Sequence, residues 1–179
     1  SSSEEHRSAE ADPLRRLIDN YSPEQAEQFR KLLLKYKDCK LFVVGAGFAE
    51  DVANYIVKRL AICGFMVFNH VHFYDYMLFQ ESRQAAVKEE NAVMFAISQS
   101  GETAPVLNDV RHAKSHGHKI ISFTRRGDSS LAQLSDLVFV IDGAKQTLAV
   151  SLPNLFFGHV ILVFEELMAS FFMPEEETQ

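Results

Sequence analysis

Five short apolar runs, separated by helical patterns, constrain most strongly what this chain of 179 residues can fold into. The runs are Leu41–Val44, Met66–Phe68, Val93–Ile97, Ile120–Phe123 and Leu137–Ile141. Each run is continuous rather than alternating, which is typical of strands buried on both faces in a parallel sheet. Because parallel strands need crossover helices, we predict an α/β fold. The expected architecture is a three-layer, doubly wound, flavodoxin-like sheet of five parallel strands with helices on both faces.

The segment before the first run contains a helix start. Ser22 suits the N-cap, Pro23 the first helical position and Gln25 the capping box. Residues 1–12 have no apolar periodicity, and we interpret them as a flexible leader or linker remnant. We expect one domain over 13–174, with its sheet at about 41–141, and an acidic tail at 175–179.

The last apolar segment, residues 151–172, reads as a helix that is apolar nearly all round. Such a helix must be buried on more than one face. One sheet face covers only one side of it, so we predict that a second copy covers the other in a dimer or tetramer. The stretch Leu155–Phe164 is interrupted and too short to span a membrane.

The formal charge of −6 comes from the two ends of the chain. Between Pro13 and Pro174 acids and bases balance, so there is no basic excess for direct nucleic-acid binding. The two cysteines, Cys39 and Cys63, have no metal-site spacing, and we expect buried free thiols. With no visible signal peptide, these features favour a cytoplasmic protein.

The loop after the first run, Gly45-Ala46-Gly47-Phe48-Ala49-Glu50, superficially resembles a dinucleotide-binding loop. It lacks the third glycine, and the second run ends in Asn69 rather than an acid. Glu50 and Asp51 would also repel a phosphate. The loop is therefore either a tight turn that lets strand and helix pack closely, or a wall of a pocket.

The loop after the third run carries three hydroxyl side chains within six residues, those of Ser98, Ser100 and Thr103. Gly101 permits a backbone turn, and a helix with free amides is expected to start at Thr103. Hydroxyl and amide donors at a helix N-terminus suit a phosphate monoester without Lys or Arg. The alternative is that one hydroxyl caps the helix and the others are solvated.

The motif Ser98-Gln99-Ser100-Gly101-Glu102-Thr103 resembles the S-x-S-G-x-T phosphosugar loop of the sugar isomerase (SIS) domain family. Gly45-Ala46-Gly47 and the segment from Ile121 to Asp136 resemble further parts of that family. The resemblance implies that Ser98, Ser100 and Thr103 hold the phosphate of a sugar phosphate. Gln99, with Gly45, Ala46, Gly47 and Phe48, would line the sugar pocket. One departure is Ala49, where the family often has a ligand-contacting Ser.

SIS domains are phosphosugar isomerases, parts of glucosamine-phosphate synthases, or sensing domains of RpiR-type transcription regulators. Isomerisation through an enediol needs a base, and the candidates are Glu102 and His159. Each candidate also has a structural explanation without catalysis. Glu102 would interact favourably with a helix dipole, and His159 would lie in a subunit interface. Since no acid–base pair stands out, we favour the sensor. Its DNA contacts would need a helix-turn-helix domain absent from this chain. An interaction scaffold with a vestigial pocket is a third hypothesis.

The histidines do not predict a metal site. His70 and His72 lie near Asp75, but the spacing supplies no third ligand, and no cofactor is implied. A second group, His112, His116 and His118, surrounds a predicted helix end at Gly117. We expect Gly117 to cap that helix and the histidine charges to complement its dipole.

Overall fold

A computed structural model describes residues 21–82, 90–141 and 154–172 of the chain. The elements run in the order α2 (Pro23–Lys35), β1 (Lys40–Gly45), α3 (Phe48–Ile62), β2 (Met66–Asn69), α4 (His70–Ser82), β3 (Ala92–Ile97), α5 (Ala104–Ser115), β4 (Lys119–Thr124), α6 (Ser130–Leu134), β5 (Leu137–Val140) and α7 (Phe156–Phe172). The predicted leader (1–12) and acidic tail (175–179) lie outside the described residues.

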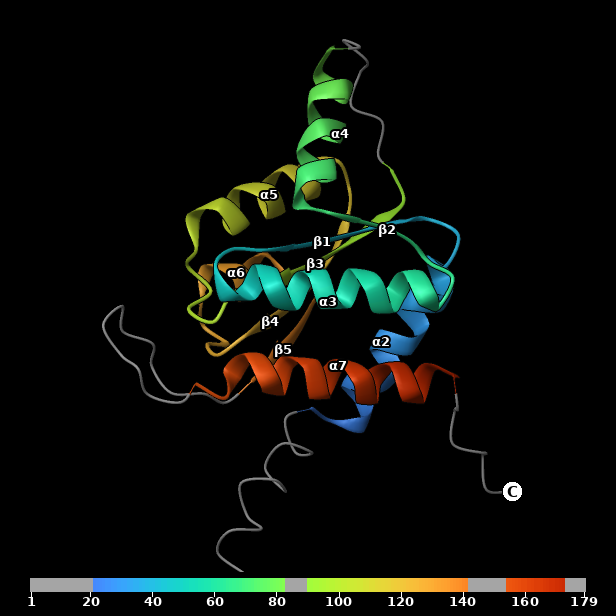
Figure 1. Ribbon diagram of the computed structural model, residues 1–179, viewed down its shortest axis with the longest axis vertical. Helices are drawn as coiled ribbons and strands as arrows, with labels where there is room; N and C mark the ends of the chain where they lie inside the picture. The colour runs from blue at the N-terminus through green and yellow to red at the C-terminus, as the bar shows by residue number, and fades with distance from the viewer. Residues whose placement is uncertain (1–20, 83–89, 142–153, 173–179) are drawn as a thin grey trace, which may run out of the picture.

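The five strands form one parallel sheet in the order β2-β1-β3-β4-β5 (Figure 1). The predicted α/β architecture, including the flavodoxin-like strand order, is therefore confirmed. Each strand lies within two residues of the apolar run that predicted it. For the inner strands β1, β3 and β4, the apolar runs are continuous because a strand covered on both faces requires apolar residues throughout.

Two separate apolar cores cover the two faces of the sheet. Helices α2, α3 and α7 pack on one face with inward side chains such as Leu41 and Val43. Helices α4, α5 and α6 pack on the other face with the alternate side chains, such as Phe42 and Val44. Figure 1 shows α3 and α7 of the first group, which contact each other, and α4, α5 and α6 of the second. The alternation follows from the two-residue period of a strand.

Strand β2 departs from the expectation that every run is buried on both faces. It is an edge strand, and Met66 is 53% exposed. The following helix, α4, was not predicted, because its sequence has no clear apolar stripe: Phe73 and Met77 are buried, whereas Val71 and Tyr74 are exposed. Figure 1 shows α4 rising away from the rest of the molecule.

Helix α7 begins at Phe156 rather than near residue 151, and residues 142–153 lie outside the described part of the chain. It packs against both α2 and α3. The expectation that only a second copy could cover its other side is therefore wrong, because α2 of the same chain contributes to that cover. The homo-oligomer itself stays a prediction.

Two smaller expectations concern the start of α2 and the two cysteines. The capping box is confirmed: Ser22 Oγ accepts the Gln25 N–H at 3.2 Å, and Gln25 Oε1 accepts the Ser22 N–H at 3.1 Å. Cys39 and Cys63 are free thiols, but they are half-buried rather than buried. Across the described ranges, no helix combines the length and apolar character needed to span a membrane.

Candidate functional site

The two loops singled out by sequence lie at the carboxyl edge of neighbouring strands. Strand β1 leads into residues 45–48, and β3, its hydrogen-bonded neighbour, leads into residues 98–103. The chain continues from β1 to β2 on one side of β1 and enters β3 on the other. The strand order thus switches between these two loops, which is where doubly wound sheets bind ligands.

The loop after β3 is folded around its own hydroxyls. Ser98 Oγ lies 2.7 Å from Thr103 Oγ1 and accepts the Gly101 N–H at 3.1 Å. Ser100 Oγ accepts the Glu102 N–H at 3.1 Å. Ser98 is 2% exposed, whereas Ser100 is exposed. The structure therefore brings the three predicted hydroxyl residues into one tight turn, with Ser98 buried beneath it and Ser100 on its surface.

The alternative reading, that one of these hydroxyls caps the helix, is not what the structure shows. Thr103 is the N-cap of α5, but its side chain makes no capping hydrogen bond. Its hydroxyl is paired with Ser98 instead. The positive end of the α5 dipole therefore faces the loop without a capping side chain from Thr103, an arrangement suited to an anion.

Neighbouring segments hold this loop tightly. Gly101 has φ +69°, and a Cβ there would overlap the Ser129 side chain and lie 3.0 Å from Thr124 Oγ1. The Gly101 carbonyl accepts the Leu131 N–H at 3.0 Å, and the Gln99 carbonyl accepts the Arg125 N–H at 3.0 Å. Only glycine fits position 101, so the loop is a preformed turn.

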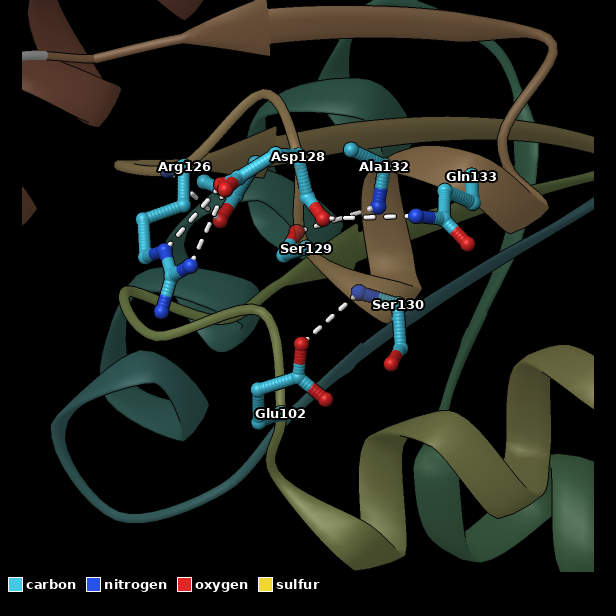
Figure 2. Close-up of polar contacts among 8 residues, drawn as sticks. Glu102, Arg126, Asp128, Ser129, Ser130, Ala132 and Gln133 are labelled. Carbon is cyan, nitrogen blue, oxygen red and sulfur yellow. Dashed lines mark hydrogen bonds and ion pairs between the residues drawn. The ribbon is translucent and has the colours of Figure 1, made fainter.

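The Glu102 carboxylate lies at the start of α6, whereas the sequence predicted that it would interact with the dipole of the helix that follows it, α5. The carboxylate accepts the Ser130 N–H at 2.8 Å, as Figure 2 shows. Hydrogen bonding from the main chain and the side chain of Ser130 holds the pKa of Glu102 below its ordinary value. Close by, Arg126 forms a two-pronged ion pair with Asp128, at 3.0 and 3.1 Å. A carboxylate with a lowered pKa is a weaker proton acceptor.

The loop after β1 is also shaped by its glycines. A Cβ on Gly45 would lie 2.5 Å from the Ala49 carbonyl oxygen, so Gly45 permits close packing of β1 against α3. Gly47 has φ +63° and is the N-cap of α3. Phe48 is 66% exposed and contacts the Phe157 ring on α7. Ala49, the departure from the family motif, is buried in the α2/α3/α7 core.

Gln99 is buried and faces a residue that the sequence analysis missed. Asn154 Nδ2 donates to Gln99 Oε1 at 2.8 Å, and Gln99 Nε2 lies 3.4 Å from Asn154 Oδ1. Asn154 Oδ1 also accepts the Phe156 N–H at 3.0 Å. An Asn just before an apolar helix is a readable signal for a side chain that caps the first turn. Its pairing with Gln99, 55 residues earlier, is not readable from local sequence.

The remaining candidates lie elsewhere. His159 lies in the first turn of α7 and is half-buried. His70 is the first residue of α4, and its Nδ1 lies 3.8 Å from Glu50 Oε1 of α3. His72 is exposed. In the part of the chain that the structure describes, no three His, Cys, Asp or Glu side chains form a group that could hold a metal ion.

His118 contradicts the expectation of a charge that complements a helix dipole. It is 3% exposed, and its ring stacks on Phe42 with 5.7 Å between centroids. Burial lowers the pKa of His118 to about 4, so the ring is neutral at pH 7. The cap prediction itself holds: His116 is the C-cap of α5, and Gly117 follows it with φ +79°.

Curated relatives match parts of the chain. An uncharacterized protein of Archaeoglobus fulgidus is 34% identical over 58% of this chain and 51% of its own length. The 3-hexulose-6-phosphate isomerase of Mycobacterium gastri is 32% identical over 60% of this chain and 49% of its own. An uncharacterized HTH-type transcriptional regulator of Clostridium perfringens is 24% identical over 83% of this chain and 52% of its own. The chain thus spans about half the length of these relatives.

Solved structures share the fold over nearly the whole chain. The Vibrio vulnificus NanR protein complexed with ManNAc-6P has a TM-score of 0.72 and 17% identity, covering 98% of this chain and 63% of NanR. The sugar isomerase domain of an RpiR transcription factor from Sphaerobacter thermophilus has a TM-score of 0.71 and 17% identity, covering 94% of this chain and 88% of that domain.

A family model gives the decisive match. The model described as the SIS domain matches residues 33–164, which include all five strands, both site loops and the first half of α7. This agrees with the motif at 98–103 and with the strand order. The chain therefore belongs to the SIS domain family of phosphosugar-binding domains.

Proposed function

We propose that this chain is the phosphosugar-binding effector domain of an RpiR-type transcriptional regulator. The observation that carries the proposal is the turn at residues 98–103, where hydroxyls and amides gather at the start of α5. A phosphate monoester can accept hydrogen bonds from these groups and is favoured by the helix dipole. Ser98, Ser100 and Thr103 would hold the phosphate. Gln99 and residues 45–48 would meet the sugar.

The state of Glu102 favours a sensor over an isomerase. An enediol step needs a base that can take a proton from the carbon next to the carbonyl. Glu102 is bonded to Ser130, and that bond lowers its pKa and orients the carboxylate toward α6. Similarity to an HTH-type regulator over most of the chain supports the same role. DNA would be bound by another domain of such a regulator.

A phosphosugar (aldose–ketose) isomerase is the alternative. The similarity to a 3-hexulose-6-phosphate isomerase favours it. In that case Glu102 or His159 would be the base. The two functions make opposite predictions about what happens to a bound sugar phosphate over hours.

Phosphorus and proton NMR of a sugar-phosphate panel incubated with the chain separates the two functions. The sensor is expected to broaden the signals of one sugar phosphate selectively without converting it. Steady appearance of a new aldose or ketose phosphate would establish the isomerase instead. If no sugar phosphate is broadened or converted, the interaction scaffold replaces both.

Substitution of Ser100 tests the location of the site. Ser100 is exposed, so Ser100→Leu changes the loop surface without filling the core. We expect it to abolish sugar-phosphate binding. The control is Ser115→Leu, since Ser115 is exposed at the opposite end of α5. Equal binding by both variants would show that the loop assignment is wrong.

We also propose a homo-oligomer. Exposed apolar side chains on α4, among them Val71, Tyr74, Leu78 and Phe79, support self-association. Sedimentation of the chain with and without sugar phosphate tests this proposal. A single monomeric species under both conditions would exclude it.

A further inference from the structure

The amide pair between Gln99 and Asn154 joins the proposed sugar site to the start of α7. Asn154 Nδ2 donates to Gln99 Oε1 at 2.8 Å, and Gln99 Nε2 donates to Asn154 Oδ1 at 3.4 Å. The same Asn154 Oδ1 accepts the Phe156 N–H at 3.0 Å and so caps the first turn of α7. One side chain therefore contacts the loop residue and starts the helix.

This pairing determines which way the Gln99 amide points. A glutamine amide presents an oxygen acceptor on one side and an NH2 donor on the other. The donated hydrogen bond from Asn154 takes the oxygen side of Gln99. The main chain of Gln99 is held as well, because its carbonyl accepts the Arg125 N–H at 3.0 Å. Gln99 is 8% exposed, so few other orientations are open to it.

Both site loops reach the same turn of α7. Besides the Gln99–Asn154 pair, Phe48 from the loop after β1 contacts Phe157, with 5.9 Å between ring centroids. Further along the same helix, Glu165 bonds Arg59 of α3 at 2.6 Å, and Glu166 accepts the Tyr21 hydroxyl at 2.8 Å. Helix α7 thus links the site loops to the residues at the start of α2.

We propose that Asn154 is a positioning residue of the sugar site. It sets the orientation of the Gln99 amide toward the sugar, and it couples sugar binding to the capped first turn of α7. This inference rests on the proposed phosphosugar-binding function. The phosphate contacts do not involve Asn154, because they come from Ser98, Ser100, Thr103 and the α5 amides.

The test compares a sugar phosphate with phosphate alone. The probes are D-fructose 6-phosphate, D-arabinose 5-phosphate and inorganic phosphate, titrated by NMR into the wild type and Asn154→Ser. Serine has a hydroxyl that can still accept the Phe156 N–H, but it has no amide to pair with Gln99. We expect the affinity for the sugar phosphate that binds best to fall about fivefold, the equivalent of one hydrogen bond, with phosphate affinity unchanged.

A second variant tests the orientation of the amide. In Asn154→Asp the carboxylate cannot donate to Gln99 Oε1, so the 2.8 Å hydrogen bond is lost and only the donation from Gln99 Nε2 can hold the amide. We expect the preference between the two sugar phosphates to change while α7 remains capped. Asn69→Ser is the matched control, because Asn69 Oδ1 accepts the His72 N–H at 3.1 Å at the start of α4. It should leave all three affinities unchanged.

Coupling to α7 is read from hydrogen exchange. In the wild type, the bound sugar phosphate is expected to slow exchange of the Phe156 amide more than inorganic phosphate does, and this difference should vanish in Asn154→Ser. An equal loss of phosphate and sugar-phosphate affinity, or no loss of either, would overturn the inference while leaving the proposed function intact. A wild type that binds no sugar phosphate would overturn both.

Discussion

The two ends of the sheet bury polar side chains in opposite ways. At the carboxyl edge, the Ser98 hydroxyl is paired with Thr103 and accepts the Gly101 N–H. At the amino edge, His118 is packed among the rings of Phe42 and Phe73. Neither ring nitrogen of His118 has a hydrogen-bond partner among the described residues.

The difference shows what a binding loop requires. At the carboxyl edge, the buried Ser98 hydroxyl organises the turn of the proposed site through Thr103 and the Gly101 N–H. At the amino edge, a lone neutral imidazole contributes apolar contacts and loses hydrogen bonds that water would supply. A buried polar side chain therefore shapes the loop of the proposed site at one edge, whereas at the other edge an unpartnered one reduces the stability of the fold.

Gly101→Ala is expected to break the carboxyl edge most severely. The new Cβ would overlap Ser129 at a position with φ +69°. We expect a loss of about 3 kcal/mol of stability, from crowding and backbone strain, and loss of sugar-phosphate binding. Urea unfolding and ligand titration measure the two effects.

The control for that prediction is Gly64→Ala. Gly64 also has positive φ, +90°, but a Cβ there has nothing within 4 Å. It should show only the backbone strain, about 1 kcal/mol. Equal losses for the two variants would mean that Ser129 does not restrict position 101.

Ser98→Ala and Ser122→Ala compare a partnered with an unpartnered buried hydroxyl. Ser122 is fully buried in β4, and its Oγ has no partner among the described residues. Removing the Ser98 hydroxyl is expected to cost about 2 kcal/mol, because the Thr103 hydroxyl loses its partner and the Gly101 N–H keeps only the Ser98 carbonyl, at 3.2 Å. Removing that of Ser122 should be neutral or stabilising. Thermal unfolding of the two variants decides, and a larger loss at Ser122 would contradict the comparison.

His118→Leu is expected to stabilise the amino edge by about 1 kcal/mol at pH 7, since two unpartnered nitrogens are removed. The pKa of His118 is about 4 in the folded chain, below its ordinary 6.5. Wild-type stability from this group is therefore complete above pH 6.5 and is lost as the pH falls toward 4. The variant should lack that decline. Urea unfolding between pH 4 and 8 measures it.

Two features bear on the His118 measurement. Burial raises the pKa of Asp109 to about 6, so its contribution is lost as pH rises from about 4 to 6 and partly offsets the His118 slope. The difference between variant and wild type removes this shared term. Exposed His72 supplies the control, since His72→Leu should leave the slope unchanged. An identical slope in His118→Leu would show that His118 does not titrate abnormally.

Glu102→Gln is expected to have the smallest effect on stability. The amide oxygen can still accept the Ser130 N–H, but the negative charge is lost. Since the folded pKa of Glu102 is lowered, its contribution is present above its ordinary pKa of 4.5 and is lost as pH falls below it. Acid unfolding should therefore be slightly less steep in the variant. Under the isomerase alternative, Glu102→Gln instead abolishes turnover while binding persists.

Much of this fold could be predicted from local sequence. The continuous runs located all five strands; in the inner strands β1, β3 and β4 this is because two-sided burial demands apolar residues at every position. Ser22, Pro23 and Gln25 located the start of α2 because capping involves residues within one turn. The loop at 98–103 was recognisable because its hydroxyls, glycine and helix start are adjacent in the chain.

The features that the sequence did not predict depend on residues far apart in the chain. Glu102 bonds Ser130, Asn154 bonds Gln99, and His118 stacks on Phe42. Each pair meets only because the strand order places particular loops and helices side by side. The exposure of β2 has the same origin, since an edge position follows from strand order and not from composition. Short-range patterns of polar and apolar residues therefore determined the strands, most of the helices and the loop at 98–103. Tertiary packing decided which polar side chains have hydrogen-bond partners, which are buried without them, and which helix each side chain contacts.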